Sequence, residues 1–355
     1  MNLVANWFRR TFSDPQVVAL ILALIAGFTI ILFFGNMLAP VLASLVIAYL
    51  LEGVVGVLEQ YHLPRLLAVT IVFISFMLFV VLILFGVLPL ASNQMTELVQ
   101  QLPNMVSSGQ KSLMRLPELY PEIVTAEQIT RMITVIKSEI ALAGQKILST
   151  SASSVVGIIA VLVYLILVPL LVFFFMKDKA LIVQWFLRFF PKDRGIADQV
   201  WIDVDMQIAN YVRGKFWEVL IVGLASYAVF SLFGLNYALL LGVLVGLSVV
   251  IPYIGAAVVT LPVLLVAWFQ WGWSGAFGGL AAAYFVIQAI DGNVLVPLLF
   301  SEVVNLHPVA IIVSILVFGG LWGFWGVFFA IPLGTLVKAV LTAWPSQQLE
   351  ATDGN

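Results

Sequence analysis

The sequence predicts an all-α polytopic membrane protein, and three observations support this fold class. Of the 355 residues, 63% are hydrophobic and only 10% are charged, whereas soluble domains carry about 25% charged residues. The mean hydropathy is +1.13. No Asp, Glu, Lys, Arg or His occurs from 219 to 290. Because a helix needs about 20 apolar residues to cross a hydrocarbon core of roughly 30 Å, that stretch has room for three crossings, or for two crossings and a re-entrant pair.

Seven apolar runs are long enough to cross a membrane as helices. They cover residues 17–34, 66–90, 155–176, 219–233, 256–271, 275–290 and 309–333. A further run, 38–51, extends about 21 Å at 1.5 Å per residue if it ends before Glu52. It therefore either fails to cross or continues to Leu58 and carries Glu52 at membrane depth.

The run 237–250 is also short, and it is followed by Pro252 and Gly255. Because proline removes a backbone donor and glycine loosens the backbone, we expect a re-entrant or half-helix here, with these two residues as hinges. In total we expect about eight transmembrane helices, some of them re-entrant or broken. Residues 235–271 and 306–344 carry Leu, Ala, Gly, Pro and Trp in a similar order. The similarity indicates either paired repeats with interrupted helices or chance in a sequence of this composition.

The chain divides into three parts and a tail. We expect a three-span N-terminal unit at 1–90, a helical extra-membrane insertion at 91–153, a C-terminal transmembrane bundle at 154–345 and a disordered tail at 346–355. Within the bundle, the segment 177–217 is amphipathic and holds a cluster of Lys and Arg. The positive-inside rule places this segment in the cytoplasm, together with the N-terminus.

The expected insertion carries a helix signature. Thr125 and Gln128 have the spacing of a capping box. Apolar residues follow on one helical face, namely Ile129, Met132, Ile133, Ile136, Ile140 and Ile147. This face either packs against a neighbouring helix or subunit, or lies on the membrane surface and gates access to the spans.

Composition and motifs argue against several classes of function. The net charge is -2, and the 16 Lys and Arg are too dispersed to follow a phosphate backbone, so we expect no nucleic-acid partner. The chain has no cysteine and only 2 histidines, and it lacks the sequence motifs of nucleotide binding and of hydrolases. We therefore expect no enzyme activity, no cofactor and no metal site.

Polar residues at the end of the uncharged stretch are the first candidate site. A carboxylate at the bilayer centre costs roughly 2.5 to 3.5 kcal/mol, so it persists mainly where it faces a cavity, a partner or an ion. Gln288, Asp291 and Asn293 follow one another at such a position, with Gly292 and Pro297 as expected hinges. The group forms either a polar pocket on a substrate or ion pathway, or a wetted cap at an interfacial helix end.

Four further residues are candidates for the same pathway. Glu302 and His307 could form a proton relay, because histidine changes charge near neutral pH, or could lie in a polar loop between spans. Arg213 could pair with an intramembrane acid or a lipid phosphate, or could anchor the adjoining span on the cytoplasmic side. Glu52 joins the set if the run from 38 to 58 crosses the membrane.

Five motifs, in order along nearly the whole chain, resemble the autoinducer-2 exporter family of bacterial permeases. They are AYLL at 48–51 leading to LPR at 63–65, FFFMKD at 173–178, YVRGK at 211–215, IPYIG at 251–255, and DGNVLVP at 291–297 followed by LHP at 306–308. The resemblance implies an eight-span helical fold with an extra-membrane insertion, and a homo-oligomer. It implies export of the quorum-sensing signal autoinducer-2 by some members and sodium/proton antiport by others. The chain departs from the family at Asp291, where Glu is expected, and at 301–302, where Gly is usual.

We therefore expect a permease of the bacterial inner membrane that exports a small polar solute, which by resemblance includes autoinducer-2. A second hypothesis is a Na⁺(Li⁺)/proton antiporter that uses an intramembrane carboxylate, with a monovalent cation and a proton as ligands. A third is a non-transporting oligomeric scaffold that acts through 91–153. All three have the lipid bilayer as a partner.

Overall fold

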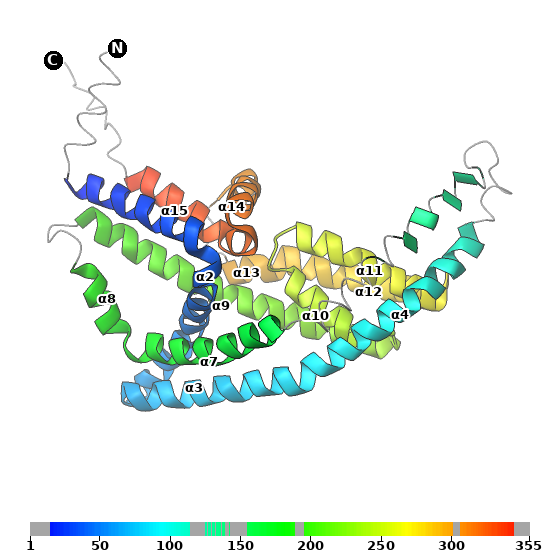
Figure 1. Cartoon of the computed structure of the whole chain (residues 1–355), viewed down its shortest axis with the longest axis horizontal. Helices are drawn as coiled ribbons and strands as arrows, with labels where there is room; N and C mark the ends of the chain where they lie inside the picture. Colours follow the sequence, from blue (N-terminus) through cyan, green and yellow to red (C-terminus); the bar gives the residue numbers. More distant parts are fainter. Residues whose placement is uncertain are drawn as a thin grey trace, which may run out of the picture. The chain divides into compact units, whose positions relative to one another are not determined.

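The computed structural model of the chain is built from helices (Figure 1). It describes residues 15–113, single positions between 125 and 142, and residues 155–188, 195–300 and 306–343. The helices are α2 (Pro15–Gln60), α3 (Arg65–Leu82), η1 (Ile83–Val87), α4 (Leu88–Leu113), α7 (Val155–Lys177), α8 (Lys179–Leu187), α9 (Gly195–Phe233), α10 (Ala238–Ser248), α11 (Ile254–Trp271), α12 (Gly275–Ile290), η2 (Asp291–Leu295), α13 (Val296–Phe300), α14 (Pro308–Phe328) and α15 (Ala330–Ala343). The segments η1 and η2 are π-helical turns. The expected tail at 346–355 lies outside the described residues.

The helices are those of a polytopic membrane protein. Within the described ranges, 6 stretches are long and apolar enough to cross a membrane: Met37–Gln60, Arg65–Ser107, Val204–Phe233, Ile254–Trp271, Gly275–Phe300 and Pro308–Phe328. Val163–Lys177 and Ala238–Ser248 are shorter apolar helices. The expected all-α membrane fold is confirmed.

The first described helix settles how the run from 38 onwards continues. Helix α2 passes without a break through Glu52 to Gln60, so the run continues beyond Glu52; the position of Glu52 at membrane depth stays a prediction. The Ser44 hydroxyl donates to the Pro40 carbonyl oxygen one turn earlier, at 2.6 Å. The helix ends at a turn in which His62 takes a φ of 66°, and α3 begins directly afterwards at Arg65.

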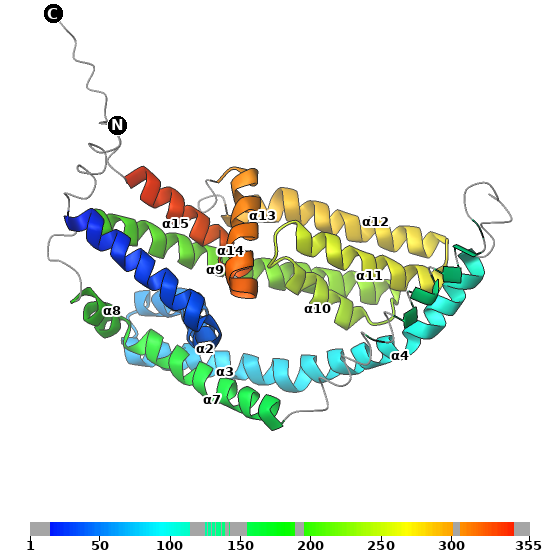
Figure 2. The same cartoon turned by 45° about the horizontal axis from the view of Figure 1, so that its top comes forward.

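The chain forms two compact units, and each is described by itself. The first unit comprises Met1–Ile74, Ile166–Phe216 and Pro297–Asn355, and the second comprises Ser75–Leu165 and Trp217–Val296. In the second unit, α10, α11 and α12 lie together (Figures 1 and 2). Its apolar core also includes Ala91 of α4, with Met95 and Leu98 packed against it. Helix α4 therefore continues across residue 90, where the N-terminal unit was expected to end. The extra-membrane insertion expected at 91–153 stays a prediction.

Helix α10 has 11 residues and measures about 16 Å, which is too short to cross a bilayer. Two of its glycines allow close contact with α9. A Cβ on Gly242 would lie 2.9 Å from the Tyr227 Cα, and one on Gly246 would lie 2.9 Å from the Gly223 Cα. Gln94 of α4 accepts a hydrogen bond from the Leu240 amide at 2.9 Å and so caps the first turn of α10. The half-helix interpretation agrees with this length, and its re-entrant course stays a prediction.

Two chain reversals of similar design lie about 70 residues apart, one in each unit. A Cβ on Gly255 would lie 1.7 Å from the Ser248 carbonyl oxygen, and one on Gly326 would lie 1.8 Å from that of Phe318. Each reversal contains a residue of positive φ, at Tyr253 (62°) and at Gly323 (60°). The pair favours repeats over chance as the origin of the similarity between 235–271 and 306–344.

The capping box expected near 125 is present. The Thr125 amide donates to Gln128 Oε1 at 3.0 Å, and the Gln128 amide donates to Thr125 Oγ1 at 3.3 Å. On the apolar face that follows, Ile133 is buried. The other five residues of this face, Ile129, Met132, Ile136, Ile140 and Ile147, lie outside the described residues.

Candidate functional site

A chain of neutral polar groups runs between two apolar helices of the second unit. The Tyr284 hydroxyl of α12 lies 2.9 Å from Thr260 Oγ1 of α11. It also accepts a hydrogen bond from Gln288 Nε2 at 3.0 Å. Tyr284 is completely buried, and its ring lies beside that of Phe230 with the centroids 6.0 Å apart. We call Gln288, Tyr284 and Thr260 the hydroxyl–amide chain.

Asp291 lies one helical turn beyond Gln288 and is buried, with 8% of its surface exposed. It is the first residue of the π-helical turn η2. Residues 284, 288 and 291 follow at i, i+4 and i+7, so the three side chains share one face of the helix. Because π-helical turns inside α-helices occur frequently at functional sites, this end of α12 is the best candidate site of the second unit.

Asn293 lies on the other side of this turn. It is exposed, and its Nδ2 donates to the Ala289 carbonyl oxygen of its own helix at 2.9 Å. Of the expected polar trio, the structure therefore brings Gln288 and Asp291 to one face and leaves Asn293 off it. A Cβ on Gly292 would meet no atom within 4 Å, so close packing does not require glycine at this position.

The expected pair of Glu302 and His307 is only half visible, because Glu302 lies outside the described residues. His307 is exposed and precedes α14, where its Nδ1 accepts a hydrogen bond from the Val309 amide at 3.3 Å. With Pro308 in the first turn, this is the local geometry of a helix N-terminus. A capping role thus accounts for His307 without a proton relay.

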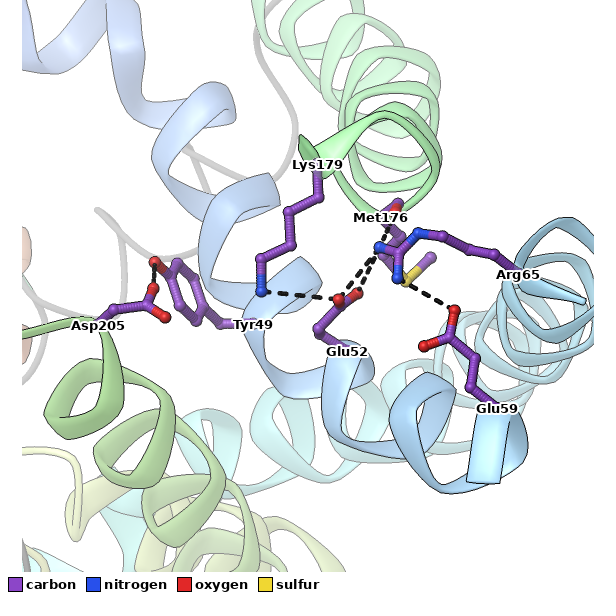
Figure 3. A network of polar contacts seen from close by, with 7 residues as sticks. All are labelled: Tyr49, Glu52, Glu59, Arg65, Met176, Lys179 and Asp205. Carbon is purple, nitrogen blue, oxygen red and sulfur yellow. Dashed lines mark hydrogen bonds and ion pairs between the residues drawn. The ribbon is translucent and has the colours of Figure 1, made fainter. Parts of the chain in front are cut away.

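Glu52 lies in a network of charged side chains in the first unit (Figure 3). Arg65 donates to both carboxylate oxygens of Glu52, at 3.1 and 3.3 Å, and to Glu59 Oε1 at 3.2 Å. Lys179 Nζ lies 3.6 Å from Glu52 Oε1. We call these four residues the charge cluster. Arg65 also donates to the carbonyl oxygen of Met176 in the last turn of α7, where a cation is favourable for the helix dipole.

Helix α9 contacts α2 on both sides of Glu52 in the sequence. The Tyr49 hydroxyl donates to Asp205 Oδ1 (Figure 3). Arg213 lies against Gly53, since a Cβ there would lie 3.2 Å from the Arg213 Cδ. Arg213 is otherwise exposed. Arg213 therefore packs against α2 one residue from Glu52, and the family motifs at 48–65, 173–178 and 211–215 meet in this unit.

From the run that continues to Glu218, the sequence analysis chose Arg213 as the candidate, whereas the buried charged residues are two others beside it. Lys215 is 5% exposed and Glu218 is 2% exposed, and both lie in the apolar stretch Val204–Phe233. Lys215 Nζ lies 5.2 Å above the ring of Phe300. Tyr211, on the same face, donates its hydroxyl to the Phe328 carbonyl oxygen at 2.8 Å. Helical periodicity could have identified the two buried charged residues, because residues 211, 215 and 218 share one face of α9 and Arg213 lies on another.

The fold and these sites define the class of the protein. A multi-pass helical bundle with polar side chains buried between apolar spans is the architecture of a membrane permease. The chain belongs to the AI-2E transporter family, since the family described as AI-2E family transporter matches residues 4–346. The family resemblance inferred from the five motifs is therefore confirmed.

Three relatives illustrate the range of this family. The chain is 48% identical over 349 residues to a protein of Escherichia coli K12 that carries the name permease PerM, covering 98% of this chain and 99% of the relative. It is 29% identical over 311 residues to a protein of Bacillus subtilis 168 that carries the name transport protein YrrI, with 85% of each chain covered. It is 25% identical over 331 residues to the AI-2 transport protein TqsA of E. coli K12, with 93% of each covered.

Proposed function

We propose that the protein exports a small polar solute across the bacterial inner membrane, along the face of α12 and η2 that carries Tyr284, Gln288 and Asp291. One observation carries this proposal. In helices apolar enough to span a membrane, a hydrogen-bonded chain of neutral groups leads to a buried carboxylate one turn away. Ionisable residues inside membrane spans are costly and mark substrate or ion pathways.

Autoinducer-2 is the first solute to test. The relative TqsA carries AI-2 transport in its name, and it matches over 93% of this chain. The 25% identity is low, and the nearer relative PerM is named only as a permease. Small neutral polyols belong in the same test, because carboxylate and amide oxygens accept hydrogen bonds from hydroxyl groups.

The experiment compares the unaltered protein with Asp291→Asn in proteoliposomes. We expect release of labelled autoinducer-2 or polyol to fall about tenfold or more, because the substitution removes the charge from the pathway while nearly preserving its shape. Asp178→Asn is the matched control, since this residue lies in the turn after α7 beside Lys177, at 3.9 Å, and should leave release unchanged.

The internal pH is recorded in the same vesicles after addition of Na⁺ or Li⁺. Cation-dependent proton flux that disappears in Asp291→Asn would establish antiport in place of solute export. Equal solute release by both proteins, without proton flux, would remove Asp291 from the pathway and refute the proposal.

A further inference from the structure

The hydrogens of the hydroxyl–amide chain can be assigned from its geometry. Thr260 Oγ1 lies 2.7 Å from the Ala256 carbonyl oxygen, one turn earlier in α11. A carbonyl oxygen can only accept, and a threonine hydroxyl has a single hydrogen. The Thr260 hydrogen is therefore used on its own helix. In the 2.9 Å contact between Thr260 and Tyr284, Tyr284 must be the donor.

This assignment fixes the next bond as well. Because the Tyr284 hydrogen points to Thr260, the Tyr284 oxygen can only accept from Gln288, which lies 3.0 Å away. Gln288 must then turn its NH₂ group, and not its carbonyl, towards Tyr284. The hydrogen bonds run in one direction, from the Gln288 amide through Tyr284 and Thr260 to the Ala256 carbonyl oxygen.

The direction of these hydrogen bonds also determines where the carbonyl oxygen of the Gln288 side chain points. With its nitrogen held by Tyr284, the amide carbonyl Oε1 faces away from that hydroxyl. The Asp291 carboxylate follows one turn along the same buried face. Both groups offer oxygen acceptors, so a solute that meets this face meets groups that bind its hydrogen-bond donors.

We propose that Tyr284 is a positioning residue of the transport pathway, which acts by holding the Gln288 carbonyl outwards as an acceptor for solute hydroxyl groups. This inference rests on the proposed export of a small polar solute. A buried site that is built to pair with a hydroxyl discriminates strongly against a ligand that lacks it. Tyr284, completely buried and in contact with Phe230, is fixed well enough to orient the amide.

Tyr284→Phe tests the inference, because it removes the hydroxyl and keeps the ring. Proteoliposomes are loaded with autoinducer-2, glycerol, erythritol or xylitol, and with the mono-O-methyl ether of each polyol, which lacks one donor. We expect the unaltered protein to prefer a polyol over its ether, and Tyr284→Phe to reduce that preference about fivefold. Tyr227→Phe, an exposed tyrosine of α9, is the matched control and should keep the preference.

A double substitution separates positioning from general support of the fold. If Tyr284 acts through Gln288, the effect of Tyr284→Phe on the preference should vanish in a Gln288→Ala background. Undiminished preference in Tyr284→Phe, with transport intact, would overturn the inference and leave the proposed export standing. Equal loss of preference in both backgrounds would also overturn it. Failure of the unaltered protein to release any of these solutes would instead refute the proposed function itself.

Discussion

The charge cluster of the first unit is held by ion pairs, whereas the hydroxyl–amide chain of the second is held by hydrogen bonds between neutral groups. The charge cluster lies near helix ends, and its side chains keep contact with solvent, with 36% of Arg65 and 23% of Glu52 exposed. The hydroxyl–amide chain lies along the middle of two spans, and Tyr284 is completely buried. Burying a charge costs more than burying a neutral hydroxyl or amide group, which needs only a hydrogen-bond partner.

Under the proposed function, the charge cluster holds helices together and the hydroxyl–amide chain lies on the solute pathway. Arg65 links α3 to two carboxylates of α2 and to the end of α7, so the charge cluster fastens helix ends together. In the proposed pathway, the hydroxyl–amide chain leaves the Gln288 carbonyl oxygen as an acceptor for a solute. We therefore expect substitutions in the charge cluster to change stability, and substitutions in the hydroxyl–amide chain to change selectivity.

The largest effect on stability is expected from Arg65→Met. This change leaves Glu52 and Glu59 without their shared cation and removes the donor to the Met176 carbonyl oxygen. Partial exposure weakens each pair, so we expect a total loss of about 2 kcal/mol. The thermal midpoint of unfolding in nanodiscs measures this loss.

Arg131→Met is the control, because Arg131 and Glu127 are 79% and 75% exposed and their pair should contribute little. Equal midpoints for the two variants would contradict an architectural role.

A smaller effect is expected from Tyr49→Phe, which removes the hydroxyl that donates to Asp205. We expect a loss of about 1 kcal/mol in stability and an unchanged preference between a polyol and its methyl ether. Tyr284→Phe should show the opposite pattern, with a small change in midpoint and a large change in preference. Both variants are measured for thermal midpoint and for preference between a polyol and its methyl ether. A change of preference in Tyr49→Phe would contradict the separation of the two roles.

The smallest effect is expected from Lys179→Met. Its ammonium group makes a single contact of 3.6 Å with Glu52 and is 45% exposed, so the loss should stay below about 0.5 kcal/mol. Salt should remove even this difference, because ions screen exposed pairs. Midpoints measured at low and high NaCl test this, and a difference from the unaltered protein that persists at high NaCl would show that packing, not charge, is lost.

The length and composition of the apolar runs were sufficient to predict the all-α membrane fold and the short helix α10, and the spacing of Thr125 and Gln128 was sufficient to predict the capping box. The contacts of Glu52 could not be predicted, because Lys179 reaches it from a distant part of the sequence and Arg65 reaches it across a turn from the next helix. Tyr284 was missed for another reason. In an apolar helix a tyrosine looks like any core aromatic, and only its neighbours Thr260 and Gln288 reveal the hydroxyl as the centre of a polar chain.

The stretch Arg65–Ser107 is helical over 43 residues, which corresponds to about 65 Å. A hydrocarbon core of roughly 30 Å takes up less than two thirds of that length even when the helix tilts by about 40°. A single straight crossing would therefore leave some 25 Å or more of this helix outside the hydrocarbon. Because the chain contains no cysteine, a thiol introduced near Ser107 would be unique, and a membrane-impermeant reagent could report from which face of the membrane this helix emerges.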